Sequence, residues 1–461
     1  MPARWDKANA WLRTIACILS TTISSPSSAN QHTDRLVFAH YMACCPFAGR
    51  NASIESLQHE MSLAARAGID GFAINVGAWL KEPYYQNISS RLFQAAQQSG
   101  FKLFFSADAA TGLSSAEVVD MVTRFWKESS YLKESGRPVL STFGGSIEWY
   151  QQILDELKSR GISIFFVPNV RRPASPENIP GSLIETPDKA TVQAILSDVP
   201  FADGLFYFGA AGKYHAISKS IEIGSDLTRS HSKLYMAPVT PYYRGLKQNF
   251  RVFEADGFVG MAEQWKAAIE SKVDWIELVT WNDWAESSYV RPFEGEATIP
   301  LWNNHWGLLA AHDAYLSLSE YYIKWFKTGQ MPKVAKSRIH VFYRPQSSTR
   351  CSLAPIGSCP RGFGDLRDLI HVVAEADKSV TIEIANGSAH QIFRGAPGLS
   401  FHKLALLPGP IRIIARSEDA SAEWEAPIPY DSKEGELTTF NYLAVSLELK
   451  PGSQSRGSNE K

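Results

Sequence analysis

The stretch VDWIELVTWNDWAESSYV covers residues 273–290 and decides which fold the sequence predicts. Its first half, 273–281, is an apolar run of β-branched and aromatic residues, which is typical of a strand buried on both faces. Polar and aromatic side chains crowd the residues that follow. An apolar strand that ends in such a cluster is typical of the active rim of a parallel α/β barrel. We therefore expect residues 282–290 to contribute to a functional site.

Two carboxylates stand in this cluster, Asp283 and Glu286. They are three residues apart, so a turn after Trp284 would place both on one wall of a cleft. Two carboxylates beside aromatic side chains suit cleavage of a glycosidic bond, because one donates a proton to the leaving oxygen and the other handles the water or the sugar. The competing interpretation is a helix-capping aspartate with an exposed glutamate beside it. The aromatic neighbours and the position after a strand favour a catalytic pair.

The rest of the first 330 residues alternates strand-like with helix-like segments. The eight expected pairs are 36–42 with 53–67, 71–76 with 89–99, 102–108 with 115–128, 138–143 with 147–160, 162–167 with 190–196, 204–208 with 214–223, 233–239 with 257–271, and 273–281 with 306–326. This number of pairs predicts an α/β fold of the (β/α)8 TIM barrel type. A doubly wound open sheet is the rival, although no glycine-rich phosphate loop follows any of the expected strands.

The pattern changes after about residue 332, where short strand-like runs are separated by Gly, Pro, Asn and Asp. Such runs predict a smaller C-terminal β-sandwich domain. That domain could bind glycan or only buttress the barrel, and the sequence leaves both open. The expected organisation is a signal peptide over 1–29, a barrel over 30–331, a β-sandwich over 332–450 and a disordered tail over 451–461.

The expected signal peptide has basic residues, a short apolar stretch at 14–23 and the small residues Ser27-Ser28-Ala29. It predicts a secreted protein, located outside the cell or in a cell wall. Secretion permits disulfides, and Cys351 and Cys359 close a short loop that suits one. Cys44 and Cys45 are adjacent, and we do not expect them to pair.

Composition narrows the class of partner. The formal net charge is −1, which gives no electrostatic reason to expect nucleic acid or an anionic membrane. No run is long enough for a membrane helix. The sequence also lacks the spacings typical of zinc sites and the Gly-x-Ser-x-Gly elbow of serine hydrolases. We expect no metal, no cofactor and a monomer.

A barrel enzyme builds its site from several strand ends, so the other strand ends supply further candidates. The residues predicted to bind substrate are His40, Tyr41, Asn75, Asp108, Tyr207, Tyr242, Trp281, Asn282, Trp284 and Tyr289. Asp108 is the strongest outside 273–290, because a carboxylate that ends an apolar strand is costly without a partner. A lone His40 is more often a hydrogen-bonded core residue. Glu277 is interpreted as a satisfied carboxylate of the barrel interior, with a role as third acid left open.

Five of these segments resemble glycoside hydrolase family 71, the mostly fungal α-1,3-glucanases or mutanases. The matching pieces are VFAHYM at 37–42, GIDGFAINVG at 68–77, GFKLFFSAD at 100–108, YMAPVTPYY at 235–243 and TWNDWAESSY at 280–289. The resemblance implies a (β/α)8 catalytic domain that hydrolyses the polysaccharide α-1,3-glucan with inversion. It places the catalytic pair on Asp283 and Glu286. We assign Glu286 as the acid and Asp283 as the base, although the sequence permits the reverse.

The sequence departs from the family pattern at three points. Ala285 stands where the family usually has Gly, and Ser288 stands where it has His. The third expected strand ends Ser-Ala-Asp-Ala at 106–109, where the family commonly has Ser-Phe-Asp-Met. A Gly-to-Ala change strains the turn only if φ is positive there. Two alternatives therefore remain beside the α-1,3-glucanase: a catalytically weakened glucan-binding protein, and a glycosidase of another linkage specificity.

Overall fold

The computed structural model describes residues 34–170, 186–245, 250–302, 306–348, 360–430 and 440–451 of the 461-residue chain. Three predictions lie outside these residues: the signal peptide, the Cys351–Cys359 disulfide and all of the disordered tail except Pro451. The residues that the structure describes belong to one compact unit, His32–Lys461.

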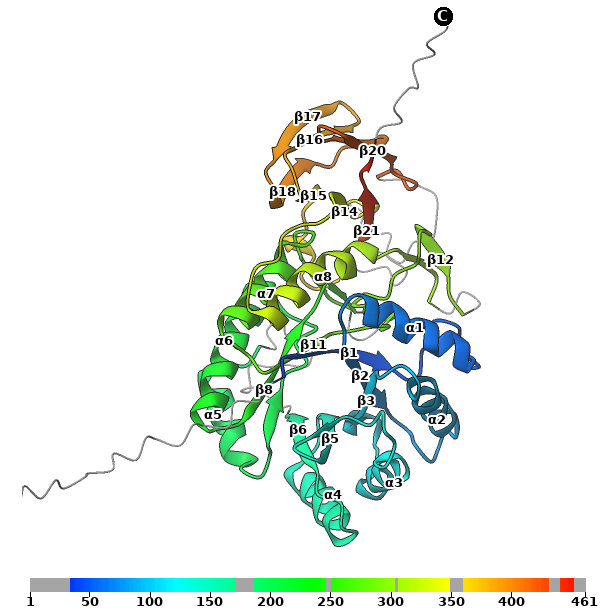
Figure 1. Cartoon of the computed structure of the whole chain (residues 1–461), viewed down its shortest axis with the longest axis vertical. Coiled ribbons are helices and arrows are strands. Elements are labelled where there is room, and N and C mark those ends of the chain that lie inside the picture. Colours follow the sequence, from blue (N-terminus) through cyan, green and yellow to red (C-terminus); the bar gives the residue numbers. More distant parts are fainter. Residues whose placement is uncertain are drawn as a thin grey trace, which may run out of the picture. The chain divides into compact units, whose positions relative to one another are not determined.

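A curled parallel sheet forms the larger part of the fold (Figure 1). Its parallel strands are β1 (Leu36–Met42), β2 (Gly71–Val76), β3 (Lys102–Asp108), β5 (Arg137–Phe143), β6 (Phe165–Asn169), β7 (Gly204–Phe206), β8 (Leu234–Val239) and β11 (Trp275–Leu278). They pair in the order β6-β5-β3-β2-β1-β11-β8-β7, and the short β4 (Lys133–Glu134) adds to β5 in the antiparallel sense. The last of the parallel strands along the chain, β11, thus lies in the middle of the sheet beside β1.

Helices follow the strands and complete the α/β pattern. They are α1 (Ile54–Arg66), α2 (Tyr84–Ala96), the 3-10 turn η1 (Ala109–Thr111), α3 (Ser115–Phe125), α4 (Ile147–Ser159), α5 (Lys189–Asp198), α6 (Tyr214–Ser230), α7 (Val259–Glu270) and α8 (Asp313–Thr328). Side-chain caps start four of the α-helices and the turn η1, and Ser114 forms a capping box with Glu117. The predicted alternation is confirmed.

The predicted boundaries are least accurate around the last pair. The ladder of β11 ends at Leu278, three residues before the predicted end of the strand. The predicted helix 306–326 begins only at Asp313, because β12 (Thr298–Pro300) and β13 (Leu308–Ala310) pair as an antiparallel ribbon first. This ribbon had no strong alternating pattern in the sequence.

The two ends of the curled sheet approach each other without a shared ladder in the described residues. Asp203, just before β7, donates its backbone N–H to the carbonyl of Phe166 in β6 over 2.9 Å. Its Oδ2 accepts from the Phe166 N–H, also over 2.9 Å. The structure therefore shows an α/β fold whose sheet curls at least as far as a half-barrel.

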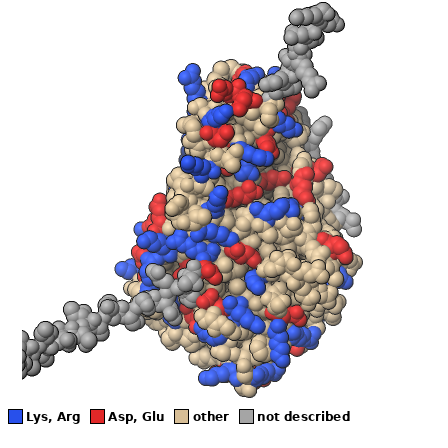
Figure 2. Space-filling model, viewed as in Figure 1, with Lys and Arg blue, Asp and Glu red and all other residues tan. Residues whose placement is uncertain are grey.

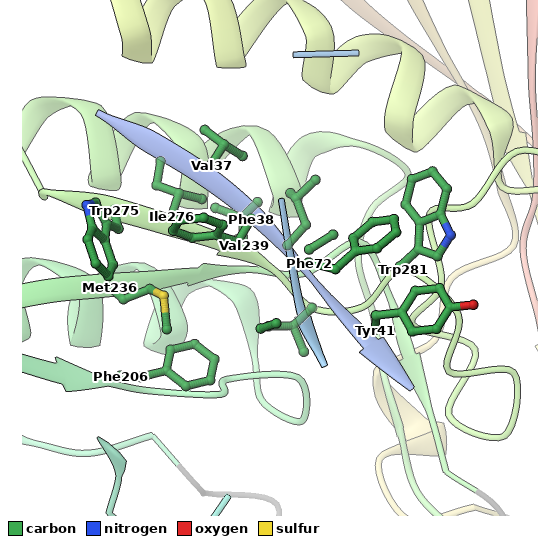
Figure 3. Packing of buried hydrophobic residues seen from close by; sticks show 14 of the residues in the cluster. Val37, Phe38, Tyr41, Phe72, Phe206, Met236, Val239, Trp275, Ile276 and Trp281 are labelled. Carbon is green, nitrogen blue, oxygen red and sulfur yellow. The ribbon is translucent and has the colours of Figure 1, made fainter. Parts of the chain in front are cut away.

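Aromatic rings fill the inside of the curled sheet. Phe38 packs edge-on against Phe104 and Trp275, with ring centroids 5.0 and 5.5 Å apart. Phe165 approaches Trp275 at 5.9 Å, and these four side chains are almost fully buried. Figure 3 shows Phe38 and Trp275 among the packed residues. Because this interior is a packed core, chemistry must lie at the ends of the strands rather than inside the sheet.

Two antiparallel sheets follow the last helix. One has the order β18-β15-β14-β21, from β14 (Arg338–Tyr343), β15 (Leu369–Ala376), β18 (Gly398–Ala405) and β21 (Leu443–Glu448). The other has the order β17-β16-β19-β20-β22, from β16 (Val380–Asn386), β17 (Ala389–Gly395), β19 (Ile411–Arg416), β20 (Ala420–Glu425) and β22 (Lys450–Pro451). Apolar side chains of both sheets share one buried cluster.

A buried ion pair ties these sheets to the parallel sheet. The short strands β9 (Tyr243–Arg244) and β10 (Val252–Phe253) pair after β8, and Glu254 follows them. Glu254 accepts from the Arg344 guanidinium over 2.8 Å and from the Tyr442 hydroxyl over 2.6 Å. The segment next to β8 is thereby fixed to the C-terminal sheets.

Charge is mixed on the surface. Lys and Arg side chains are interspersed with Asp and Glu on the face drawn in Figure 2, as the net charge of −1 leads one to expect. Among the described residues, none of the helices is both long and apolar enough to cross a membrane.

Candidate active site

The loop after β11 doubles back on itself and on β1. Its Thr280 N–H donates to the Ser288 carbonyl over 2.8 Å, and the Val290 N–H returns to the Thr280 carbonyl over 3.0 Å. The Trp281 N–H donates to the carbonyl of His40 at 2.8 Å. These bonds leave residues 282–287 as a turn at the carboxyl end of the sheet.

The turn holds Asp283 and Glu286 through a chain of hydrogen bonds. The Asp283 N–H donates to Oγ1 of Thr280 over 2.8 Å. Oδ1 of Asp283 in turn accepts from the backbone N–H of Glu286 over 3.0 Å. The two carboxylates are therefore brought onto one turn, as the three-residue spacing predicted.

Strand β9 supports Glu286 from the other side. The Tyr243 hydroxyl donates to Oε1 of Glu286 over 2.9 Å, and the Arg244 N–H donates to the Glu286 carbonyl over 2.8 Å. Burial and the Glu286 charge raise the pKa of Tyr243 well above its usual value, so the phenol stays protonated and acts as the donor. The Arg244 guanidinium is fully buried and donates to Oγ of Ser287 over 2.9 Å.

The charge of Asp283 is set by opposing influences. Burial raises the pKa of the Asp283 carboxyl above its usual value, and this influence is the largest. Backbone N–H groups of Glu286 and Ala285, together with His40 and Arg244, favour the ionised form and limit the increase. Asp283 therefore combines a raised pKa with several groups that stabilise its anion.

The side chains on either side of Asp283 are used to fix the loop. Oδ1 of Asn282 accepts from the Met42 N–H over 2.7 Å, and its amide donates to the carbonyls of Met42 and Cys45 over 3.1 and 2.9 Å. Nε1 of Trp284 donates to the same Cys45 carbonyl over 2.9 Å. Both side chains are at most 1% exposed. Their polar atoms bond to Met42, at the end of β1, and to Cys45, which follows it.

The segment after β1 contains a disulfide between Cys44 and Cys45. The expectation that these adjacent residues do not pair is wrong. A turn starts at the end of β1, where the Cys45 N–H donates to the Met42 carbonyl over 3.0 Å. The two Cα atoms are 3.8 Å apart, and the turn brings the sulfurs together. Adjacency in sequence alone therefore did not rule out the bond.

Glu60 is a carboxylate that the sequence analysis missed. It lies on α1 and is buried, and its Oε2 accepts from Nε1 of Trp281 over 2.8 Å. Its Oε1 accepts from the Phe47 N–H over 3.2 Å. The only signal in the sequence was its place beside Leu57 and Met61 on the apolar face of the helix. Burial raises the pKa of Glu60, and Arg291 opposes the increase.

The structure separates the other predicted site residues into two groups. Tyr41, Tyr242, Trp281 and Tyr289 lie in the interior, where their polar atoms bond to other parts of the protein. His40, Asn75, Asp108 and Tyr207 lie at strand ends or just beyond them. Asp108 is half-buried, and its Oδ1 accepts from the Ala110 N–H over 3.0 Å at the start of η1.

Two departures from the family pattern can now be located. Ala285 does not have positive φ, so its methyl group causes no backbone strain in the turn. Ser288 is fully buried, with Oγ 3.3 Å from Oγ1 of Thr280. Within the described ranges, no group of three or more His, Cys, Asp or Glu side chains is arranged to hold a metal ion.

Comparisons with known proteins agree with the resemblance of residues 280–289 and the other segments to glycoside hydrolase family 71. A model of glycosyl hydrolase family 71 matches residues 33–455. The chain is 26% identical over 436 residues to a glucan endo-1,3-alpha-glucosidase of Schizosaccharomyces pombe, covering 90% of this chain and 95% of that protein. It is 25% identical to a mutanase of Penicillium rubens, covering 78% and 77%. An ascus wall endo-1,3-alpha-glucanase of S. pombe is 24% identical, covering 77% and 82%.

Proposed function

The chain belongs to glycosyl hydrolase family 71, and we propose that it hydrolyses the α-1,3-glucosidic bonds of α-1,3-glucan. The observation that carries this proposal is the turn after β11, which joins Asp283 to Glu286 through a hydrogen bond of 3.0 Å. Relatives named as α-1,3-glucanases and a mutanase match this chain over most of its length. The substrate is therefore a polysaccharide.

The proposed mechanism is inversion. Glu286 protonates the glycosidic oxygen, and Asp283 activates a water on the opposite face of the sugar. This requires the two carboxyl groups to be about 6.5–9.5 Å apart, with room for the water between them. The Tyr243 hydroxyl holds the Glu286 side chain in place, and the groups that favour ionised Asp283 suit a general base.

The proposed architecture is a complete (β/α)8 barrel with a C-terminal β-sandwich. The two bonds between Asp203 and Phe166 support closure, because they join the segment before β7 to β6. The apolar cluster shared by the two antiparallel sheets supports a sandwich. The domains run over 30–331 and 332–450, after a signal peptide at 1–29.

The side chains proposed to contact the sugar lie at the strand ends. His40, Asn75, Asp108 and Tyr207 remain the candidates for binding substrate, because strand ends frame the site. Asn282 and Trp284 support the loop instead, since their polar atoms bond to Met42 and Cys45. Trp281 and Tyr289 have the same supporting role from the core. The protein is a secreted monomer that acts on glucan outside the cell or in a cell wall.

The first test is reducing-sugar release from insoluble α-1,3-glucan by wild type, Asp283→Asn and Glu286→Gln. Each variant should lose at least about a hundredfold in kcat. Glu296→Gln is the matched control, because Glu296 is an exposed glutamate ten residues after Glu286 and should keep full activity. No release by wild type, with α-1,4, β-1,3 and β-1,6 glucans in parallel, would overturn the proposal.

A second substrate, α-glucosyl fluoride, distinguishes the general acid from the general base. Hydrolysis of α-glucosyl fluoride needs no general acid, because fluoride leaves without a proton. Glu286→Gln should therefore keep much of the wild-type rate on this substrate, whereas Asp283→Asn should not. The opposite result would exchange the roles of the two carboxylates. A wild type that binds glucan but cleaves nothing would instead indicate the glucan-binding alternative.

A further inference from the structure

A buried imidazole–carboxylate pair lies beneath the proposed site. Nδ1 of His40, on β1, is 2.6 Å from Oε1 of Glu277, on β11. Both residues are fully buried. Phe38 is the ladder partner of Glu277 and points its ring into the core of the curled sheet, so His40, two residues further along β1, faces the same interior one layer nearer to the strand end.

Among the residues that the structure describes, the outer atoms of the pair have no hydrogen-bond partner. Nε2 of His40 and Oε2 of Glu277 are both buried without a hydrogen bond. Leaving a buried polar atom unpaired costs free energy, so such atoms in a native site call for an explanation. His40 lies two residues before the end of β1, the end of the sheet that carries the proposed site.

The loop that carries Asp283 is joined directly to the strand that carries His40. The Trp281 N–H donates to the His40 carbonyl over 2.8 Å, and Asn282 binds both backbone groups of Met42. The imidazole also interacts electrostatically with Asp283 and favours its ionised form. The pair is therefore built into the same end of the sheet as the proposed base.

We propose that Glu277 is a positioning residue that orients His40, and that the pair holds two protons so that Nε2–H of His40 faces the site and supports ionised Asp283. This inference rests on the proposed function, since it concerns the same site. It assigns Glu277 a role through His40 rather than as a third acid.

Proton counting supports two protons on the pair. With one proton, on Nδ1, the pair would be a buried anion near a second carboxylate, which both burial and like charge disfavour. With two protons the pair is neutral overall, and Nε2 carries a hydrogen wherever the shared proton lies. Burial raises the pKa of the Glu277 carboxyl, and His40 opposes that increase, as expected for such a pair.

The charged neighbours of the pair are few. Asp283, on the loop after β11, interacts electrostatically with the imidazole, and Arg244, on β9, interacts in the same way with Asp283. From the segment after β7 the neighbour is the ring of Phe208, edge-on to His40 with centroids 4.9 Å apart. The protonation state of the His40–Glu277 pair should therefore influence the ionisation of Asp283.

The test measures the ionisation of Asp283 directly. Carboxyl carbon NMR of Asp-labelled full-length protein, assigned with Asp283→Asn, gives the midpoint of its titration in wild type, Glu277→Gln and Glu277→Leu. Leucine leaves the imidazole with neither a hydrogen-bond partner nor a compensating charge. We expect the Asp283 midpoint to rise by about 1 pH unit in the leucine variant. Glutamine can still bond Nδ1 through its amide, and it should give a smaller rise.

Kinetics on soluble α-1,3-gluco-oligosaccharides supply a second readout. The acid limb of kcat/KM should move to higher pH by the same amount as the NMR midpoint, because Asp283 must be ionised to act as the base. In the leucine variant kcat should fall by about 10- to 100-fold, with KM within about threefold of wild type. A purely structural role for Glu277 would not move the pH profile.

The C-terminal sheets offer a matched control. There Nε2 of His340 is 3.3 Å from Oε2 of Glu375, another buried histidine–glutamate pair. Glu375→Gln should leave both the Asp283 midpoint and the acid limb unchanged. If Glu277→Leu fails to fold by circular dichroism, His40→Gln replaces it and should produce the same rise, because it removes the imidazole itself.

An unchanged Asp283 midpoint in the folded variants would overturn the inference. Equal effects of Glu277→Gln and Glu277→Leu would overturn the orienting role of Glu277. A wild type without activity on any glucan would instead overturn the proposed function. The NMR titration would still decide whether the pair acts on Asp283, so the two failures are distinguishable.

Discussion

The backbone N–H of Glu286 donates to Oδ1 of Asp283 over 3.0 Å, so one proposed catalytic carboxylate anchors the residue that carries the other. Asp283→Asn keeps an amide oxygen that can accept this bond, whereas Asp283→Ala does not. We expect both variants to lose at least about a hundredfold in kcat. Only the alanine variant should also lose about 1 kcal/mol of unfolding free energy, as for a lost helix cap.

Double variants sharpen this prediction. Because alanine at 283 releases Glu286 as well, adding Glu286→Gln to Asp283→Ala should cost little further activity. Chemical denaturation and kcat of the single and double variants provide the measurement. Additive losses in kcat would show that the two carboxylates act independently and would contradict the anchoring role.

Arg244 is expected to matter for rate through the same turn. Its backbone N–H donates to the Glu286 carbonyl, its guanidinium donates to Ser287, and its charge favours ionised Asp283. Arg244→Met should lower kcat by about 10- to 100-fold and move the acid limb of kcat/KM to higher pH. A pH profile identical to wild type would show that Arg244 does not act on Asp283.

The sequence predicted the parts of the site that depend on local pattern. The apolar run before Trp281 predicted the strand, and the spacing of Asp283 and Glu286 predicted their common turn, because both depend on neighbouring residues. The contacts that Glu60, Tyr243 and Arg244 make with Trp281, Glu286 and Ser287 were not predicted. Their partners lie far along the chain, and no single-sequence pattern reports contacts made by tertiary packing.

The same distinction applies to the aromatic residues of the loop after β11. Trp284 and Tyr289 were predicted to bind substrate because they follow an apolar strand, close to Asp283 and Glu286. In the structure their rings pack on each other, with centroids 4.9 Å apart, in a buried cluster. An aromatic residue after a strand can face either the site or the core, and only the path of the loop decides between them.

Reduction of the Cys44–Cys45 disulfide should lower activity. The Cys45 carbonyl accepts from both Asn282 and Trp284, which flank Asp283, so freeing this segment loosens the turn. We expect kcat to fall by about tenfold under reductant and to recover on reoxidation. The Cys44→Ser/Cys45→Ser variant should start near the reduced level. Full activity in that variant would contradict the prediction.

Breaking the Glu254–Arg344 pair should destabilise the protein. Both side chains are buried, and the pair joins the segment after β10 to the C-terminal sheets. Arg344→Met leaves Glu254 as an uncompensated buried charge, which should cost about 3–5 kcal/mol of unfolding free energy. Thermal unfolding of Arg344→Met and Glu254→Gln/Arg344→Met gives the comparison. The double variant should recover part of the loss.

The pH dependence of this pair has a defined sign. Burial would raise the pKa of Glu254, but Arg344 and several hydrogen bonds hold it below its usual value. Its stabilising contribution is therefore present above the pKa of an unfolded glutamate, about 4.3, and is lost as pH falls through the lower folded value. Acid unfolding that is equally steep in wild type and in the double variant would contradict this.

Asp313 should make the protein less stable as pH rises from about 4 to 6. It lies in the first turn of α8, and its Oδ1 accepts from the Phe293 N–H over 2.6 Å. Burial raises the pKa of Asp313 to about 6. A raised folded pKa means that its contribution is fully present below the unfolded pKa and is lost as pH rises through the folded value. The loss should be roughly 2 kcal/mol.

Asp313→Asn isolates this effect, because asparagine keeps an oxygen for the Phe293 N–H and does not ionise. The neighbouring His312 has its pKa lowered by burial to about 4, and its contribution has the opposite sign, being lost as pH falls. Since His312 is present in both proteins, its contribution cancels in the difference. We expect the asparagine variant to gain stability relative to wild type between pH 4 and 7, measured by chemical denaturation. A difference that stays constant over this range would show that Asp313 ionises normally in the folded protein.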